Sequence, residues 1–264
     1  MKLGFIGCGN MAKAMMKGIV NSGKVAAADI YGSNAHAESA QAVAAEFGIN
    51  AGTSNVAVAE AADILFLSVK PYQYEDVIVE ISSAVRESQV VVTVAPGKTI
   101  AWLEDKFAKP VRIVRTAPNT PALVGEGLTA YCGNSLATSE DIANVEALLS
   151  SFGKTLQLKE NLIDVCSAVG GCTPAYVYMF IEALADAGVA EGLPRAQAYD
   201  IAAQAVMGSA KMVLETSLHP GQLKDQVTSP SGTTIKGLEY LERNAFRGTV
   251  ITALRTAINA GRAQ

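Results

Sequence analysis

From Lys2 to Leu158, the sequence alternates between short apolar runs and segments whose apolar residues recur at helical spacing. The runs that predict strands are "KLGFI", "DIYGS", "ILFLSV", "VVVTV", "VRIVRT", "LTAYC" and "TLQL". Several of them are apolar throughout, which is typical of strands that are covered on both faces. Strands and helices in alternation predict an α/β fold with a mostly parallel sheet and right-handed connections.

After Lys159 the strand pattern stops, and the sequence predicts only helices, over residues 160–170, 174–192, 195–217, 221–227, 234–244 and 246–264. Pro174 is expected in the first turn of its helix, where a missing N–H is tolerated. We therefore divide the chain into an α/β domain, residues 1–158, and an all-α domain, residues 159–264. The broad apolar faces of the second domain indicate burial between subunits, with packing onto its own sheet domain as the alternative.

Composition and charge argue against several functions. The net charge is −4, and neither part of the chain forms a basic platform, so we expect no nucleic-acid partner. Four cysteines without a C-x-x-C pair and only two histidines predict no metal site, and free thiols indicate a cytoplasmic protein. The apolar stretch 165–181 runs directly into Glu182 and Asp186, which favours a helix buried in a core or interface over a membrane span.

The motif G-x-G-x-x-A lies between the first predicted strand and the first predicted helix. Its residues are Gly7, Cys8, Gly9, Asn10, Met11 and Ala12. Gly7 permits a tight turn, Gly9 lets backbone amides approach a pyrophosphate, and Ala12 keeps the helix close to the sheet. In this β/α context the motif predicts a Rossmann-type dinucleotide site, and a purely structural strand–helix turn is the alternative.

The end of the second predicted strand indicates which dinucleotide is bound. An NAD-preferring site would carry an acid there, but Asp29 precedes the strand and should lie at the far edge of the sheet. Ser33 and Asn34 occupy the end instead, and these neutral groups permit a 2′-phosphate. The sequence therefore favours NADPH over NADH, modestly, because only His36 follows and no arginine.

Three further loops carry candidate chemistry. "SVKPYQ" places Lys70 where the nicotinamide half of a cofactor would lie, although a solvated loop lysine is an equal alternative. "RTAPNTPALVGEG" is a rigid loop at the carboxyl edge of the sheet, either a ligand wall or a plain connection. "SPSGTTIKGLEYLERN" starts a helix with more hydroxyls than one N-cap needs, which predicts a receptor for a small carboxylate.

These stretches, in this order, resemble pyrroline-5-carboxylate reductase over nearly the whole chain. The likeness runs from "GFIGCGNMA" through "SVKP", "RTAPNTPALVGEG" and "PAYVYMFIEALADAGVAEGLPR" to "HPGQLKDQVTSPSGTTIKGLE". The resemblance implies a Rossmann domain followed by an all-α dimerisation domain. It also implies NAD(P)H-dependent reduction of 1-pyrroline-5-carboxylate to L-proline, the last step of proline biosynthesis. Family members pair as homodimers through the helical domain, and some build pentamers of dimers.

The resemblance also implies the site residues. It places the substrate on Val227, Ser229, Gly232, Thr233 and Thr234, with Thr234 nearest the imine nitrogen as the catalytic residue. It places the cofactor on the residues from Gly7 to Ala12 and on Ser33, Asn34, Asn55, Val69, Lys70, Pro71, Ala95, Pro96 and Gly97.

The chain departs from the family pattern at "RTAPNTP", "GGCTPAY", "SPSGTT" and "APG", each time with a small or an apolar residue. Two rival functions differ in what they require. A β-hydroxyacid dehydrogenase would carry D-x-x-V-S-G-G and a helix lysine, but no lysine occurs between Lys159 and Lys211. A cofactor-sensing module without catalysis would not need a second site at "SPSGTT".

Overall fold

The structure, a computed structural model, describes residues 1–262. The chain forms two compact units, Met1–Gly171 together with the last residues from Ile258, and Cys172–Ala257. The helix predicted over 246–264 ends with residues 263–264, which lie outside the described part. The predicted domain boundary follows the end of the last strand, whereas the compact units divide further along the chain.

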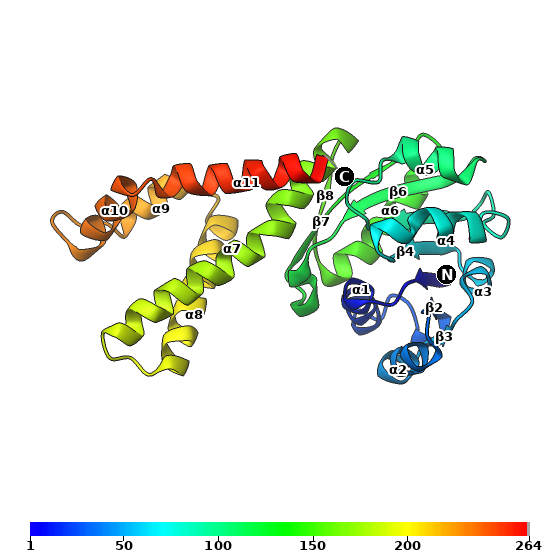
Figure 1. Ribbon diagram of the computed structural model, residues 1–264, viewed down its shortest axis with the longest axis horizontal. Helices are drawn as coiled ribbons and strands as arrows, with labels where there is room; N and C mark the ends of the chain where they lie inside the picture. Colours follow the sequence, from blue (N-terminus) through cyan, green and yellow to red (C-terminus); the bar gives the residue numbers. More distant parts are fainter. Residues whose placement is uncertain (263–264) are drawn as a thin grey trace. The chain divides into compact units, whose positions relative to one another are not determined.

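The first unit is built around an eight-stranded sheet (Figure 1). The strand order is β3-β2-β1-β4-β5-β6-β7-β8. The strands are β1 (Leu3–Ile6), β2 (Ile30–Ser33), β3 (Asn50–Gly52), β4 (Ile64–Leu67), β5 (Val90–Thr93), β6 (Arg112–Ala117), β7 (Gly127–Gly133) and β8 (Gly153–Gln157). Neighbours are parallel except β6 and β7. The predicted mostly parallel α/β sheet is confirmed. Its strand order reverses at β1, the place where ligands bind in folds of this class.

Helices cover both faces of the sheet. The first cluster of buried side chains includes residues of α1 (Asn10–Asn21), α2 (Ala37–Phe47) and α6 (Ser139–Leu149). The second includes residues of α3 (Asn55–Ala61), α4 (Tyr74–Ile81) and α5 (Ile100–Phe107). Phe5 packs in the first cluster and stacks on Phe66, while the next residue, Ile6, packs in the second. This alternation explains why the central strands are apolar at every position.

Short segments escaped the sequence prediction. β3 has three residues, Asn-Ala-Gly, whose exposed outer positions carry no strand-typical side chain. α3 and α5 span seven and eight residues, too few for a clear helical period. The short 3₁₀ segments are η1 (Ala27–Asp29), η2 (Pro71–Gln73), η3 (Thr120–Val124), η4 (Ser150–Phe152) and η5 (Glu160–Leu162).

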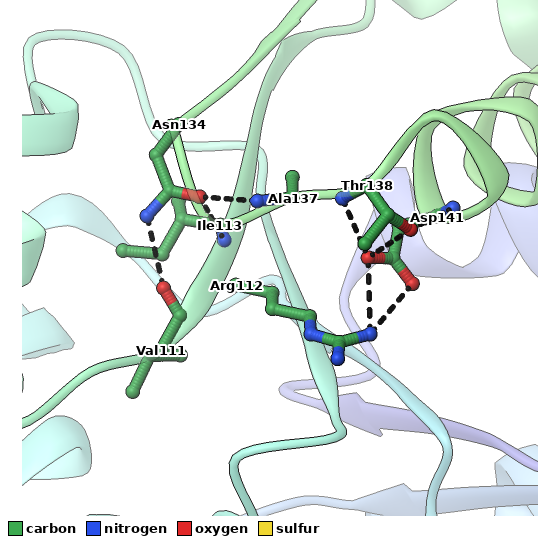
Figure 2. A network of polar contacts seen from close by, with 7 residues as sticks. All are labelled: Val111, Arg112, Ile113, Asn134, Ala137, Thr138 and Asp141. Atoms are coloured by element: carbon green, nitrogen blue, oxygen red, sulfur yellow. Dashed lines mark hydrogen bonds and ion pairs between the residues drawn. The ribbon is translucent and has the colours of Figure 1, made fainter.

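A polar network fixes the amino end of β6 and the start of α6 (Figure 2). The Asn134 side chain accepts hydrogen bonds from the amides of Ile113 and Ala137 and donates one to the Val111 carbonyl. Asp141 pairs with Arg112 at 3.2 Å and forms a capping box with Thr138. These contacts close the chain reversal between β7 and α6, at the opposite end of β6 from the carboxyl edge of the parallel strands.

The helix α7 (Ile163–Ala190) runs without interruption through Pro174, so the prediction that this proline opens a helix is wrong. Proline has no N–H for the carbonyl four residues earlier, which belongs to Gly170. Asn119 compensates, because its Nδ2 donates to the Gly170 carbonyl at 3.1 Å. Its Oδ1 in turn accepts the amide of Leu128 at 2.9 Å. The "RTAPNTP" loop thus supplies the partner that the helix lacks.

The second unit is all-α. Besides the later part of α7 it contains α8 (Arg195–Thr216), α9 (Pro220–Gln226), α10 (Thr233–Arg243) and most of α11 (Phe246–Arg262). Among the described residues, its buried hydrophobic cluster consists of Ala185, Ala198 and Ala202, with Ile181 and Val189 packed against them. Three alanines remove little apolar surface from water, so this unit lacks a substantial core of its own.

Candidate functional site

The turn between β1 and α1 requires glycine at its first position. Gly7 has φ +88°, a left-handed conformation that side chains disfavour, and its amide donates to the Ser33 carbonyl at 3.0 Å. A Cβ at this position would lie 2.7 Å from Val69 Cγ1 and 2.9 Å from the Val69 amide nitrogen. Gly7 therefore lets the loops after β1, β2 and β4 meet closely.

The N-terminus of α1 is open. Gly9 is its N-cap, and a Cβ built there would meet no atom within 4 Å. The first turn reads Asn10-Met11-Ala12-Lys13, so no carboxylate competes for its backbone N–H groups. Ala12 is fully buried and brings the helix close to the sheet. An uncrowded glycine N-cap, followed by a first turn without a carboxylate, fits a pyrophosphate, so these residues suit a dinucleotide.

Cys8 differs from its neighbours in the motif because its side chain points into the core. Its thiol is buried and sits so close to Gly32 that a Cβ on that glycine would lie 2.7 Å from the sulfur. Burial raises the pKa of Cys8 to about 11, which keeps the thiol protonated at neutral pH. Its backbone amide donates to Asn34 Oδ1 at 3.0 Å. Asn34 therefore shapes the glycine turn directly.

At the end of β2 the structure brings Ser33 and Asn55 together. The buried Ser33 hydroxyl donates to Asn55 Oδ1 at 2.7 Å, and Asn55 Nδ2 donates to Glu80 Oε2 at 2.7 Å. Asp29 lies in η1, which precedes β2, as predicted. Sequence reasoning missed Glu80, because its approach to Asn55 depends on how α3 and α4 pack. The neutral strand end expected from the sequence thus has one carboxylate beside it.

The loops after β4 and β5 share a buried hydroxyl. Tyr74 donates to the Leu67 carbonyl and accepts hydrogen bonds from Thr93 Oγ1 at 3.0 Å and the Val94 amide at 3.3 Å. Burial raises the pKa of Tyr74 to about 12, so it remains a donor at neutral pH. Sequence reasoning missed both Tyr74 and Thr93, since a tyrosine in an apolar helix looks like ordinary core.

The residues expected on the nicotinamide side follow these two strands. Ser68 donates to the Gly7 carbonyl at 2.8 Å and ties the "SVKP" loop to the glycine turn. Lys70 is exposed, and Pro71 opens η2. After β5, Ala95 is buried, Pro96 is exposed and Gly97 has φ +74°.

The segment after Gly97 leads into α5. Thr99 caps this helix by accepting the Trp102 amide at 3.1 Å, and the Lys98 ammonium lies 4.6 Å from the centre of the Trp102 ring. Lys106, one turn further on, lies 5.8 Å from the same ring. Two cations therefore hold the indole beside the loop that follows β5.

In the second unit, the hydroxyl-rich start of α10 has glycine as its N-cap. Gly232 has extended backbone angles, and its amide donates to the Ser229 carbonyl at 3.1 Å. A Cβ on Gly232 would collide with the Ser229 hydroxyl. Ser231 has φ +58°, which is strained for a residue with a side chain.

The hydroxyls of this segment are therefore not used as the helix cap. Thr233, Thr234 and Ser229 are exposed, and the first turn reads Thr-Thr-Ile-Lys without a carboxylate. Val227, just after α9, is 68% exposed and offers an apolar surface beside them. Backbone N–H groups, hydroxyls and the helix dipole together suit a carboxylate with a small apolar body.

Comparison with known proteins assigns the family. The chain is 48% identical to the pyrroline-5-carboxylate reductase of Escherichia coli (strain K12) over 253 residues, covering 96% of this chain and 94% of the relative. The chain belongs to the pyrroline-5-carboxylate reductase family. The resemblance found in the sequence is thereby confirmed.

Solved members of the pyrroline-5-carboxylate reductase family share the fold. The Plasmodium falciparum protein, solved with NADP bound, matches with a TM-score of 0.91 at 35% identity, covering 100% of this chain and 97% of that one. The Coxiella burnetii protein matches with a TM-score of 0.92 at 31% identity, covering 99% and 97%.

Two family models match different parts of the chain. Residues 160–264 match the pyrroline-5-carboxylate reductase dimerisation domain. Residues 2–97 match the NADP oxidoreductase, coenzyme F420-dependent, family. The predicted order, a Rossmann domain followed by a helical dimerisation domain, is thereby confirmed.

Proposed function

We propose that this protein is an NADPH-dependent oxidoreductase that reduces 1-pyrroline-5-carboxylate to L-proline, the final step of proline biosynthesis. The observation that carries the proposal is the start of α10. A glycine N-cap there leaves the surrounding hydroxyls free for a ligand. The family relationship and the glycine turn at α1 supply the second partner of the reaction, a nicotinamide dinucleotide.

Within this proposal, the cofactor lies along the carboxyl edge of the sheet. The residues proposed to hold it are Gly7, Cys8, Gly9, Asn10, Met11, Ala12, Ser33, Asn34, Asn55, Val69, Lys70, Pro71, Ala95, Pro96 and Gly97. Cys8 contributes through its backbone, because its thiol is buried. When bound, the reduced nicotinamide supplies the hydride for the C=N bond. Ser33 and Asn34 support a preference for NADPH, with NADH as a slower alternative.

The substrate carboxylate binds at the start of α10, where the hydroxyls of Ser229 and Thr233 and the first-turn amides that follow the N-cap Gly232 offer neutral donors. Val227 packs against the pyrroline ring and excludes water from one side of it. The Thr234 hydroxyl accepts a hydrogen bond from the N–H of the protonated imine and orients the C=N bond. A hydroxyl is a poor acid, so Thr234 contributes position and dipole, and the imine takes its proton from solvent before reaction.

The test follows the absorbance of reduced nicotinamide when the purified protein meets pyrroline-5-carboxylate. We expect oxidation that requires the imine and is faster with NADPH than with NADH. Binding of NADPH without any turnover would contradict the proposal and favour a cofactor-sensing module. A faster reaction with NADH would contradict only the cofactor preference.

We further propose that the second unit pairs with another copy of itself, giving a homodimer. Its small alanine core leaves many large apolar side chains exposed, among them Tyr178, Met179, Ile201, Met207, Leu214, Tyr240 and Ile251. Such a surface is typical of a subunit interface. Light scattering at micromolar concentration should give the mass of two chains, or of ten if five dimers assemble; a monomer would contradict the interface.

The same interface accounts for the apolar character of α7. The stretch Glu160–Ala190 has an 18-residue window of mean hydropathy 1.2, long and apolar enough to cross a membrane by length and composition. The stretch carries Asp164, Pro174, Glu182 and Asp186, and we assign its part from Cys172 onward to the subunit interface instead. None of the four cysteines, all within the described residues, forms a disulfide, which supports a cytoplasmic location. We propose no nucleic-acid or membrane partner.

A further inference from the structure

A buried arginine lies between two carboxylates at the carboxyl half of β6. The Arg115 side chain is 2% exposed, with Nη1 3.3 Å from Glu160 Oε1 and Nη2 2.5 Å from Asp164 Oδ1. Its Nε is the one buried side-chain nitrogen or oxygen without a hydrogen-bond partner among the described residues. Burying a guanidinium costs solvation free energy, so an apolar residue would be the simpler choice for stability alone.

The two carboxylates also hold the loop that follows β5. Asp164 Oδ1, which contacts Arg115, accepts the Gly97 amide at 3.3 Å. Glu160 Oε1, the other oxygen on Arg115, accepts the Ile100 amide at 2.6 Å. Each oxygen thus joins the guanidinium to one backbone amide, and the two amides bracket residues 97–100.

This loop carries Ala95, Pro96 and Gly97, which are proposed to line the nicotinamide. We call these three residues the nicotinamide wall. Its near end is anchored inside the sheet, where Ala95 N lies 3.5 Å from Thr93 Oγ1. Its far end turns at Gly97 through a left-handed conformation, and the two carboxylates bind the backbone amides on either side of Lys98 and Thr99. The ionic cluster is therefore the feature that defines where the far end of the wall lies.

We propose that Asp164 and Glu160, held in place by Arg115, are positioning residues for hydride transfer. They contact the backbone of the loop, and they fix the position of the far end of the nicotinamide wall. This inference rests on the proposed function. Misplacement of reacting groups by about 1 Å can cost on the order of 100-fold in rate, so a small loop shift would be visible in turnover.

The decisive variants are Asp164→Ala, Asp164→Asn and Glu160→Gln. Asp164→Ala removes both contacts, whereas Asp164→Asn keeps an oxygen for the Gly97 amide and loses the charge opposite Arg115. Glu75→Gln is the matched control, because it breaks the Glu75–Lys106 ion pair of 2.7 Å on α4 of the same unit, where Glu75 is 58% exposed. Each variant is compared with the unchanged protein for thermal stability before kinetics.

We expect Asp164→Ala to lower kcat by about tenfold or more at saturating imine and NADPH. The primary deuterium isotope effect on kcat, measured with NADPH deuterated at the transferred position, should rise because hydride transfer becomes slower. Asp164→Asn and Glu160→Gln should give smaller changes in the same direction, and Glu75→Gln none. A merely structural role would lower the amount of active protein and leave the isotope effect unchanged.

A second measurement separates the two halves of the cofactor and needs no turnover. The affinity for 2′-phospho-ADP-ribose, which lacks the nicotinamide, should stay within about twofold in Asp164→Ala, while the affinity for NADPH falls. Equal losses for both ligands, or an unchanged isotope effect in a folded variant, would overturn the proposal. If Asp164→Ala does not fold, Asp164→Asn carries the same test. If the unchanged protein binds NADPH but fails to reduce the imine, the proposed function fails, and the two affinities still decide the positioning role.

Discussion

Two helices of this protein start with a glycine N-cap, α1 at Gly9 and α10 at Gly232, and the two starts are built differently. The start of α1 offers backbone only: Gly9 faces free space, and the buried residue Ala12 ties the helix to the sheet. The start of α10 offers hydroxyls, and the close fit of Gly232 against Ser229 holds its turn together. Both use the positive end of a helix dipole.

The difference teaches how the same physical feature can suit the two ligands proposed above. A pyrophosphate presents several oxygens and needs close approach, which glycine backbone permits. A small imino acid presents one carboxylate and one C=N bond, which hydroxyls can orient individually. The first start lies on a well-packed sheet, and the second lies in a unit whose buried hydrophobic cluster, among the described residues, consists of three alanines. The following variants should affect the start of α1 and the start of α10 differently.

The largest effect is expected at Gly9. Gly9→Val fills the space in front of α1, so the dissociation constant of NADPH should rise at least about 100-fold, or roughly 3 kcal/mol. Because no atom lies within 4 Å of the added Cβ, the free energy of unfolding should change by only about 1 kcal/mol. Fluorescence titration with NADPH and urea unfolding measure the two quantities. The corresponding variant Gly232→Val should leave the NADPH affinity unchanged and impair use of the substrate. A loss of NADPH affinity with unimpaired use of the substrate would contradict the comparison.

Alkaline pH should lower the free energy of unfolding in part through Cys8, the buried thiol beneath the start of α1. Burial raises the pKa of Cys8 from 9.0 to about 11, so the folded state favours the protonated thiol. That contribution is complete below pH 9 and is lost as the pH rises to 11, with a limit of roughly 2.7 kcal/mol. Urea unfolding at pH 8, 9 and 10 should show the decline. Cys8→Ala should reduce this loss of the free energy of unfolding at high pH but not abolish it. The buried Cys132 thiol also has a pKa raised to about 11, and it remains in the variant.

The next effect is expected at Thr234. Thr234→Ala removes the hydroxyl proposed at the imine nitrogen, so kcat should fall by roughly 10- to 100-fold, the typical worth of a hydrogen bond to a charged group. The dissociation constant of NADPH should not change. Thr256→Ala is a suitable control, because among the described residues that hydroxyl donates to the Thr252 carbonyl within α11. Equal losses in turnover and NADPH affinity would remove Thr234 from the site.

The smallest effect is expected at Ser231. Its φ of +58° is unfavourable for serine and natural for glycine, so Ser231→Gly should relieve strain of about 1 kcal/mol. The KM for the imine should change by less than about threefold, because Ser229, Thr233 and Thr234 retain their hydroxyls. Steady-state kinetics and thermal unfolding check both statements. A loss of turnover as large as that of Thr234→Ala would mean that Ser231 also contacts the substrate.

How far the sequence could predict the site depends on how local each feature is. The glycine turn at Gly7 and the neutral end of β2 were readable, because their chemistry lies in consecutive residues. The carboxylate of Glu80 beside Asn55, and the pairing of Arg115 with Asp164, join segments far apart in the chain. No periodicity encodes such contacts, so the structure was needed to find them.

The fold shows the same limit. The central strands were predictable because two covering layers of helices require apolar residues at every position. β3 and the unbroken course of α7 through Pro174 were not. Sequence rules treat a proline as a helix start or a break, yet here the carbonyl it leaves without a partner is bound by a loop residue, Asn119. A tertiary contact thus overrides a local preference.

The position of Trp102 gives the protein an internal optical reporter. It is the only tryptophan in the sequence, and it lies in the first turn of α5, directly after the loop that carries Pro96 and Gly97. The ammonium groups of Lys98 and Lys106 lie 4.6 and 5.8 Å from its ring centre. Indole emission responds to nearby charge. Any rearrangement of this loop that moves either cation will therefore shift the wavelength of the tryptophan fluorescence.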